Sequence, residues 1–180
     1  MADLRMRSAK NEIVDREELH RILDEAMVMR LGMLDGERPY VVPLNFAREG
    51  DDLWFHAAKA GHKLDCLRAA PAVCVEVDTF IRLRTGPRAC DDWSSTYESV
   101  IGFGNAKIAE DAAEKLRGLR ALMRNYSGRE DWEFPDASVT TSSSWPVGGC
   151  SPPLRHGFGA RGINLGQGRR RGGGCGAGGP

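Results

Sequence analysis

The chain has 180 residues, and its 25 basic and 25 acidic side chains sum to a formal net charge of zero. A chain of this length fits one domain that buries a core without disulfides or a structural metal. The zero conceals two unequal parts, because residues 138–180 contain five arginines, no acidic residue and 13 of the 22 glycines. Composition therefore predicts a domain over residues 1–137 and an irregular Gly/Arg/Pro/Ser-rich tail over residues 138–180.

Several classes of protein are excluded by the sequence pattern. No window approaches 18 consecutive apolar residues, and the N-terminus lacks the apolar segment of a secretory signal. We therefore expect a cytoplasmic protein without a membrane partner, whose five cysteines are reduced thiols. The cysteines form no C-x-x-C pair and the four histidines show no zinc spacing, so no metal site is predicted.

The first third of the chain predicts a helix followed by three strands. Asp15 and Glu18 form a capping-box pattern ahead of apolar residues at helical spacing, which predicts a helix over residues 15–26. Alternating apolar residues then predict a meander of three strands, in which Asp35-Gly36 supplies the first turn. The predicted strands cover residues 27–34, 40–47 and 53–58.

The middle of the chain predicts two more strands and two more helices. Helical spacing of leucines predicts a helix over residues 61–68, which Pro71 ends, and Asp111 is the predicted cap of a helix reaching about residue 126. Strands are predicted over residues 72–78 and 97–110, with an irregular polar segment over residues 79–96. Five antiparallel strands with short helices predict a mainly β or α+β fold, a small antiparallel barrel.

The tail from Ser138 onward has neither a strand period nor a helix period, so we expect it to be disordered. Its abrupt start favours the interpretation that it is a frameshifted translation of GC-rich DNA. A flexible Arg-Gly arm for RNA is the alternative, but no aromatic residue is interleaved among the terminal arginines. No nucleic-acid partner is therefore predicted.

Four segments carry a family resemblance when they are considered together. They are RLGMLDGERPYVVPLNF (30–46), LWFHAAKAGHKLDCLRAAP (53–71), VCVEVD (73–78) and YESVIGFGNAKI (97–108). In order and spacing they resemble the pyridoxamine 5′-phosphate oxidase-like FMN-binding split-barrel proteins, and most closely the 5-nitroimidazole-resistance (Nim-like) branch. The resemblance covers residues 4–136 and implies a Greek-key antiparallel split β-barrel that binds FMN.

The predicted junction between the third strand and the second helix suits the phosphate of FMN. Helix N-termini favour anions, and a phosphate needs cationic side chains and N–H donors. Lys63 is the phosphate candidate and His62 a second candidate donor, whereas a solvated helix face is the alternative for Lys63. A half-buried strand histidine is the alternative for His56. The candidate cofactor-binding residues here are His56, Ala57, Ala58, His62 and Lys63.

The resemblance adds further cofactor contacts. It implies that strand backbone at Pro43, Leu44 and Asn45 faces the isoalloxazine ring and that Ser99 points toward the cofactor; a surface position beside Tyr97 is the alternative for Ser99. A proline within a strand cannot donate to the ladder, which indicates a sheet edge or an irregular stretch. No catalytic side chain is assigned, because the flavin itself carries the redox chemistry.

The function implied by the resemblance is that of an FMN-dependent oxidoreductase. Hydride from NAD(P)H would reduce the flavin, which passes electrons to a small aromatic or nitro-heterocyclic acceptor. Such barrels are usually homodimers with FMN between the subunits. The alternatives are a non-catalytic barrel that binds flavin or another small ligand, and an inactive truncated member of the family.

Two departures from the family pattern affect these expectations. Glu98 stands where the family often carries a basic residue. The family also closes its barrel with a final strand after the helix predicted over residues 111–126, and here the irregular tail takes that place. We therefore expect a missing final strand, an unpaired barrel edge and a destabilised fold that binds flavin weakly.

Overall fold

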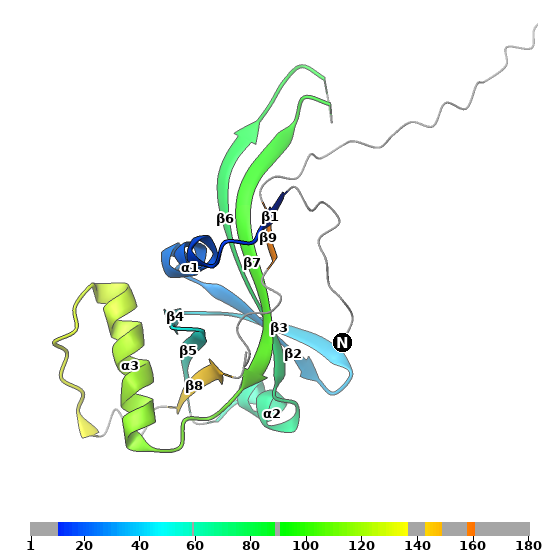
Figure 1. The fold of residues 1–180 in the computed structure, drawn as a ribbon. Coiled ribbons are helices and arrows are strands. Elements are labelled where there is room, and N and C mark those ends of the chain that lie inside the picture. The colour runs from blue at the N-terminus through cyan, green and yellow to red at the C-terminus, as the bar shows by residue number, and fades with distance from the viewer. Residues whose placement is uncertain (1–10, 59, 89–90, 137–142, 149–157, 161–180) are drawn as a thin grey trace, which may run out of the picture.

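A computed structural model of the chain describes residues 11–58, 60–88, 91–136, 143–148 and 158–160 (Figure 1). The elements of the N-terminal part are β1 (Glu12–Ile13), α1 (Arg16–Glu25), β2 (Met29–Asp35), β3 (Arg38–Leu44), β4 (Phe46–Glu49) and β5 (Asp52–Ala57). Those that follow are α2 (His62–Ala69), β6 (Ala72–Arg84), β7 (Ser94–Ala106), α3 (Ala112–Ser127), β8 (Ser143–Gly148) and β9 (Phe158–Ala160).

The strands form one antiparallel sheet in the order β3-β2-β6-β7-β8-β5-β4, and β9 pairs with β1 and β7 beside this path. Helix α3 packs against β4, β5 and β8, whereas α2 lies near β2 at the other side of the barrel (Figure 1). The predicted antiparallel α+β fold is confirmed. Within the described part of the chain, no helix is long and apolar enough to cross a membrane.

The helix starts follow the capping chemistry that the sequence predicts. The Asp15 carboxylate accepts a hydrogen bond from the Glu17 amide at 3.0 Å, and the Asp111 carboxylate accepts one from the Glu114 amide at 2.9 Å. Each carboxylate satisfies an amide that has no partner within its helix. At the other end of α3, Gly128 adopts a left-handed conformation with φ 68°, which closes the helix.

The predicted three-strand meander is wrong in its connection. The strand predicted over residues 40–47 breaks at Asn45 into β3 and β4, which lie at opposite ends of the sheet. Two hairpins result, β2 with β3 and β4 with β5, because each short turn pairs a strand with its immediate neighbour. Alternating apolar residues show which face is buried but not which strand is the partner. Pro43 does lie on an edge strand, as the ladder argument predicts.

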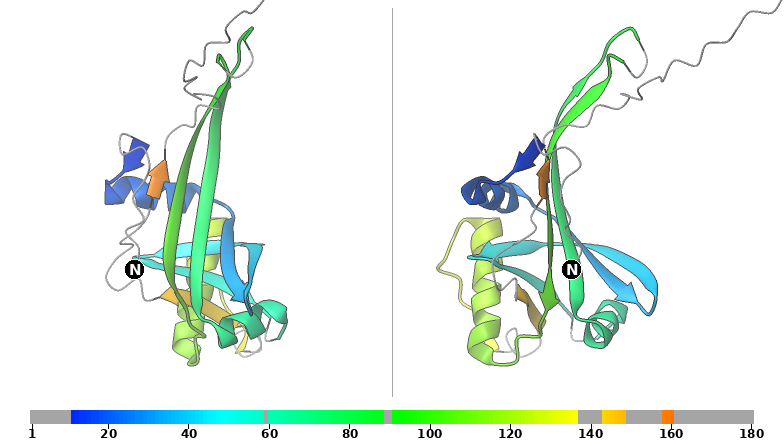
Figure 2. Two further views of the ribbon diagram at one scale, coloured as in Figure 1. Left: turned by 90° about the vertical axis from the view of Figure 1, so that its right-hand side faces the viewer. Right: turned by 45° about the vertical axis from the view of Figure 1, so that its right-hand side comes forward.

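The segment predicted to be irregular, residues 79–96, is strand at both of its ends. β6 continues to Arg84 and β7 begins at Ser94, and the two remain paired with a register shift between Phe80 and Arg82. Together they project from the barrel as a long ribbon (Figure 2). The β6 side of this ribbon is exposed and the first four residues of β7 are exposed or half-buried, so its sequence lacks the apolar alternation by which strands are recognised.

The expected absence of a final strand is also wrong. β8 pairs with β5 from Leu53–Val147 to Ala57–Ser143, and its last residue pairs with Asn105 of β7. The sheet therefore extends beyond residue 137 and the predicted edge is paired. The physical reason is that a ladder uses backbone N–H and C=O groups, which a Ser/Gly-rich segment also supplies. The disorder predicted from Ser138 onward also covers residues 138–142, 149–157 and 161–180, which lie outside the described residues, and the frameshift interpretation stays a prediction.

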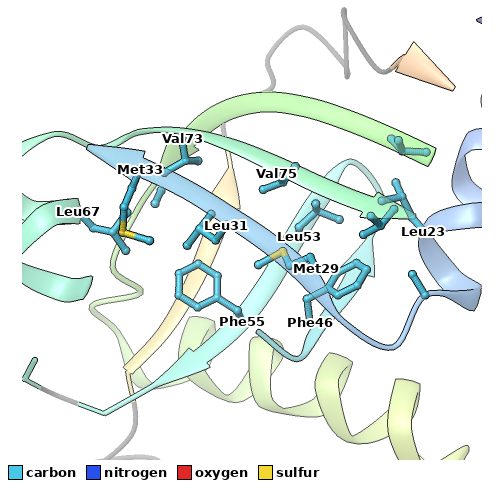
Figure 3. Close-up of a cluster of buried hydrophobic side chains, with 14 of the residues drawn as sticks. Leu23, Met29, Leu31, Met33, Phe46, Leu53, Phe55, Leu67, Val73 and Val75 are labelled. Carbon is cyan, nitrogen blue, oxygen red and sulfur yellow. The ribbon is translucent and has the colours of Figure 1, made fainter. Parts of the chain in front are cut away.

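The main hydrophobic core lies inside the barrel (Figure 3). Leu31, Phe46 and Phe55 are fully buried, and they come from three different strands. Side chains of α1 and α2 close the two sides of this interior, through Leu23 and Leu67 (Figure 3). Each large apolar side chain that is fully buried stabilises the fold by about 1.5–3 kcal/mol, so this cluster is the main source of stability.

A second, smaller cluster lies beneath α3. Trp54 of β5 is 1% exposed and packs with Ala121 and Leu122 of the helix. Gly118 allows this contact, because a Cβ at that position would lie 2.4 Å from Cε3 of Trp54. Tyr126 adds a polar connection, since its hydroxyl donates to the Met27 carbonyl at 2.7 Å and accepts from the Phe46 amide at 2.9 Å.

Candidate functional site

A cavity of about 460 Å³ opens between the end of β3 and the β5–α2 connection. Its volume falls in the range of about 300–1,000 Å³ that is typical of small-molecule sites. One wall is the edge strand β3, and the other is the segment that leaves β5 and enters α2. The lining residues are Tyr40, Val42, Pro43, Leu44, Ala57, Ala58, Ala60, Gly61, His62, Lys63 and Leu64.

Two of the segments predicted to hold the cofactor meet in this cavity. Pro43 and Leu44 come from β3, and the junction residues Ala57, Ala58, His62 and Lys63 come from the opposite wall. The hairpins β2–β3 and β4–β5 place these walls side by side, although the segments are separated in sequence. The backbone around Pro43 is available to a ligand because β3 is the last strand of the sheet on this side.

Three predicted residues lie outside the lining of the cavity. Asn45 is exposed at the break between β3 and β4, and His56 is exposed on β5. Ser99 is half-buried on β7, where it pairs with Asp78 of β6. His56 nevertheless interacts electrostatically with the site, because partial desolvation and the charge of Lys63 lower the pKa of its imidazole.

The first turn of α2 borders the cavity and provides anion-binding groups. Gly61 has a φ of 135°, a conformation that favours glycine, and it starts the helix without a side-chain cap. The amides of Leu64 and Asp65 turn back to the Gly61 carbonyl at 2.8 and 3.2 Å. The earlier amides of a helix have no acceptor within it, and together with the helix dipole they favour an anion.

Lys63 is half-buried at this helix start rather than extended into solvent. Its ammonium lies 5.6 Å from the ring centroid of Phe55, and desolvation lowers its pKa. A partly desolvated cation gains more from an anionic ligand than a fully solvated one does, since water screens the charge less. The position therefore differs from the solvated helix face that was the alternative for Lys63.

The imidazole of His62 is turned toward the β2–β3 hairpin. Its Nε2 lies 3.1 Å from Oδ2 of Asp35 and 3.8 Å from Sγ of Cys66, and its ring centroid is 5.2 Å from that of Tyr40. Sequence reasoning missed Asp35, whose only signal was the turn chemistry of Asp35-Gly36. Burial and the charges of Asp35 and Asp65 raise the pKa of the Cys66 thiol, which disfavours a nucleophilic role.

Glu98, which departs from the family pattern, has a structural partner. It is 9% exposed on β7, and its carboxylate accepts a hydrogen bond from Nη2 of Arg21 at 2.6 Å. Arg21 also pairs with Glu18 and Glu25 on its own helix. The acidic side chain at this position therefore attaches α1 to the sheet.

Comparison with known families identifies the class of protein. The sequence model of the pyridoxamine 5′-phosphate oxidase family matches residues 15–145, which include strands β2 to β7, all three helices and both walls of the cavity. The chain belongs to this family. Its antiparallel sheet with short helices is accordingly a split β-barrel, as the resemblance implied.

Solved structures place the chain among particular relatives. A Bacteroides thetaiotaomicron protein described as a 5-nitroimidazole antibiotic resistance protein is 29% identical, with a TM-score of 0.69 over 84% of this chain and 89% of that one. A flavocytochrome of Azotobacter vinelandii shares the fold at 21% identity, with a TM-score of 0.73 over 87% of this chain and 72% of that one. An FAD and heme binding protein of Mycobacterium smegmatis shares it at 18% identity, with a TM-score of 0.72 over 84% and 73% of the two chains.

One curated relative is similar to this chain over a shorter stretch of sequence. An uncharacterized protein of Rhizobium meliloti is 28% identical over 68 residues, which are 38% of this chain and 44% of that protein. The match thus spans less than half of the relative's length.

Proposed function

We propose that this chain is an FMN-binding flavoprotein that acts as an NAD(P)H-dependent reductase of small aromatic or nitro-heterocyclic compounds. The observation that carries the proposal is the cavity in which Lys63 and the start of α2 face the exposed edge of β3. One wall suits a phosphate and the other suits an apolar planar ring. These are the two ends of FMN.

The residues present fit the two parts of the cofactor. Lys63 and the first-turn amides of α2 would hold the phosphate, because cationic and N–H donors bind phosphate at helix starts. The flavin ring would lie against Val42, Pro43 and Leu44 of β3. The ring of His62 is engaged by Asp35, so this residue contributes its backbone N–H rather than its imidazole.

Bound FMN would supply hydride acceptance and electron transfer. The chain's own residues bind the cofactor: the start of α2 holds its phosphate, and the edge strand β3 orients its flavin ring. With the flavin ring against the β3 wall, a small aromatic substrate would stack on the opposite face of the ring, on the open side of the same cavity. No side chain of the described site needs to act as a general acid in this scheme.

Relatives support the chemistry. The Bacteroides protein is described as a 5-nitroimidazole antibiotic resistance protein, which favours nitro-heterocyclic compounds as the substrates of this chain. The Azotobacter flavocytochrome and the Mycobacterium FAD and heme binding protein share the fold, which supports a flavin in such a barrel. We prefer FMN to FAD because the cavity lining has a single lysine, Lys63, at one helix start, which suits one phosphate group.

We also propose a homodimer that shares its cofactor sites. Ser99 lies outside the cavity of its own chain, so a contact between Ser99 and the flavin would have to come from a second copy. An apolar groove of about 420 Å³ on the face of β2, β3, β6 and β7 includes the exposed side chains of Leu34, Val41 and Phe103. Such a face suits a second copy of this chain.

Flavin titration of the purified full chain tests the binding step. FMN, FAD and riboflavin are titrated while the quenching of flavin fluorescence is followed. Lys63→Gln should weaken FMN binding by about ten-fold or more, as expected for loss of one charged hydrogen bond, and leave riboflavin binding unchanged. Lys107→Gln, at an exposed position after β7, is the matched control. Failure to bind any flavin, or equal loss of FMN and riboflavin affinity in Lys63→Gln, would contradict the proposal.

Anaerobic reduction separates an enzyme from a passive binder. Mixing the flavin-loaded protein with NADPH or NADH should bleach the visible flavin absorption, and a nitroimidazole added afterwards should restore it. A flavin-loaded protein that neither nicotinamide bleaches is the non-catalytic barrel of the alternative interpretation. A chain that binds no flavin while remaining folded is the inactive family member.

A further inference from the structure

Three different donor side chains converge beside the hairpin turn at the end of β2. Asp35 is the last residue of β2, and His62 and Cys66 lie one helical turn apart on α2, so that both project to the same side of the helix. The His62 Nε2, an Asp35 carboxylate oxygen and the Cys66 Sγ all lie within 4.8 Å of one another. The cluster adjoins the cavity, and its side chains are not among the flavin contacts proposed above, which use only the backbone N–H of His62.

The geometry differs from that of a hydrogen-bonded chain. In such a chain the carboxylate engages one ring nitrogen and the thiol engages the other. Here the same Nε2 faces both Asp35 Oδ2, at 3.1 Å, and Cys66 Sγ, at 3.8 Å. The Asp35 carboxylate also interacts with the Cys66 thiol, so each of the three groups faces the other two. The three atoms instead surround a common point.

This common point has the dimensions of a metal site. A tetrahedral zinc centre, with bonds of about 2.0–2.3 Å, separates its nitrogen, oxygen and sulfur ligands by about 3.3–3.6 Å. The two measured separations lie within about half an ångström of that range, which small side-chain rotations accommodate. The ligand set of one imidazole, one carboxylate and one thiolate is of the borderline type that zinc accepts.

We propose that Asp35, His62 and Cys66 bind one divalent transition-metal ion of the zinc class. The side chains of Asp35 and His62 are 44% and 58% exposed, so the fourth coordination position faces solvent and takes a water. Three protein ligands and one open position are typical of zinc sites that exchange ligands rather than of closed structural sites. The sequence predicted no metal site, because the third ligand comes from a hairpin turn 27 residues before the first ligand on α2.

Cobalt titration tests the site directly. The probe metals are Co²⁺ and Zn²⁺, added to the reduced, chelator-treated full chain in which Cys90, Cys150 and Cys175 are replaced by serine. This leaves two thiols, those of Cys66 and Cys74. We expect saturation at one equivalent of Co²⁺, a thiolate-to-cobalt charge-transfer band in the near ultraviolet, and loss of the band when Zn²⁺ displaces the cobalt.

Variants assign the ligands. Cys66→Ser should abolish the charge-transfer band, and the control Cys74→Ser should keep it. Asp35→Asn, at a partly exposed turn position where folding is not at risk, should weaken Zn²⁺ binding by about ten-fold or more, since even changes outside the ligand shell cost about 10–100-fold. A folded protein without stoichiometric Co²⁺ binding, a band that survives in Cys66→Ser, or unchanged Zn²⁺ affinity in Asp35→Asn would overturn the proposal. None of these measurements requires flavin.

Discussion

Strands β6 and β7 pass through two regions of the molecule that differ sharply in environment. Within the barrel, Val73, Val75 and Val77 of β6 are between 1% and 5% exposed. Beyond the barrel, Phe80 and Ile81 of the same strand are 61% and 52% exposed. The ladder between the strands continues through both regions, apart from one register shift. Backbone pairing is therefore shared, whereas burial is not.

The difference shows that layer packing, not strand pairing, decides the stability of each region. In the barrel the strands face other strands and two helices, and in the ribbon they face no second layer of the described chain (Figure 2). A two-stranded ribbon is marginally stable by itself in water. Its exposed apolar side chains fit the second copy of the chain that the shared-cofactor proposal requires.

The largest expected effect is a core truncation in the barrel. Phe55→Ala removes a fully buried ring from the main core and should lower the free energy of unfolding by about 3–5 kcal/mol. Urea denaturation followed by circular dichroism measures the change. A loss no greater than that of a ribbon substitution would show that the barrel and the ribbon do not differ in the way their burial indicates.

A second effect tests the packing of α3 on the barrel. Alanine is favoured over glycine by about 1 kcal/mol within helices, so Gly118→Ala would stabilise an isolated helix. In this chain the added Cβ would meet Trp54 at 2.4 Å, and we expect a net loss of about 1–3 kcal/mol. Thermal unfolding measures the sign, and the exposed control Arg120→Ala should change little. A stabilised Gly118→Ala protein would mean that α3 does not pack so closely.

A third prediction concerns the border between the two regions, where Glu98 of β7 pairs with Thr79 of β6. Glu98→Gln removes the charge that faces Arg21, and we expect the free energy of unfolding to fall by about 1 kcal/mol. The Glu98 side chain is only 12% exposed, which strengthens the ion pair, whereas the Arg21 side chain is 39% exposed, which lets solvent weaken it. Glu25→Gln is the matched control, since this other partner of Arg21 is 59% exposed and should cost less than about 0.5 kcal/mol. Equal effects in urea denaturation would contradict the prediction.

The ribbon itself should respond in association rather than in stability. Phe80→Ser changes a side chain that is 61% exposed, so the free energy of unfolding should change by no more than about 0.5 kcal/mol. Light scattering should instead show a smaller mass for Phe80→Ser than for the unmodified chain at equal concentration. A large loss of stability without any change of mass would place Phe80 in the core.

The smallest expected effect is a pH dependence from His56, which lies outside the lining of the barrel's cavity. Desolvation and the charge of Lys63 lower the pKa of His56 from the ordinary 6.5, so the unfolded chain binds the proton more readily. The contribution of this group is fully present above about pH 6.5 and is lost as the pH falls through the folded-state pKa. His56→Gln should flatten that part of the stability profile. Proton NMR should show a higher His56 pKa in Lys63→Gln; an unchanged value would remove Lys63 from its surroundings.

Local chemistry made much of the fold predictable. Asp15 and Asp111 cap α1 and α3 as expected, and the Asp35-Gly36 turn joins β2 to β3. These features depend on residues close in sequence. The ribbon and the final strand were missed for the opposite reason, since exposed or Ser/Gly-rich strands form through backbone pairing and have no apolar period.

The candidate site was predictable in part. Lys63 and Pro43 could be selected from helix-start chemistry and from family resemblance, and the structure brings both to one cavity. The role of Asp35 could not be found, because nothing near it in the sequence indicates a partner on α2. Ser99 is the opposite case, because the resemblance predicts its contact with the flavin and the structure places it outside the cavity of its own chain.

The sequence by itself determined the α+β class, the capped helices, the buried faces of the barrel strands and the family. Each follows from short-range periodicity, capping or motif spacing, which act between neighbouring residues. Only the tertiary structure decided that β3 and β4 separate to opposite ends of the sheet, that β8 pairs with β5, and that Asp35 reaches His62 and Cys66. These depend on which elements pack together, and packing sums many weak contacts between residues far apart in the chain.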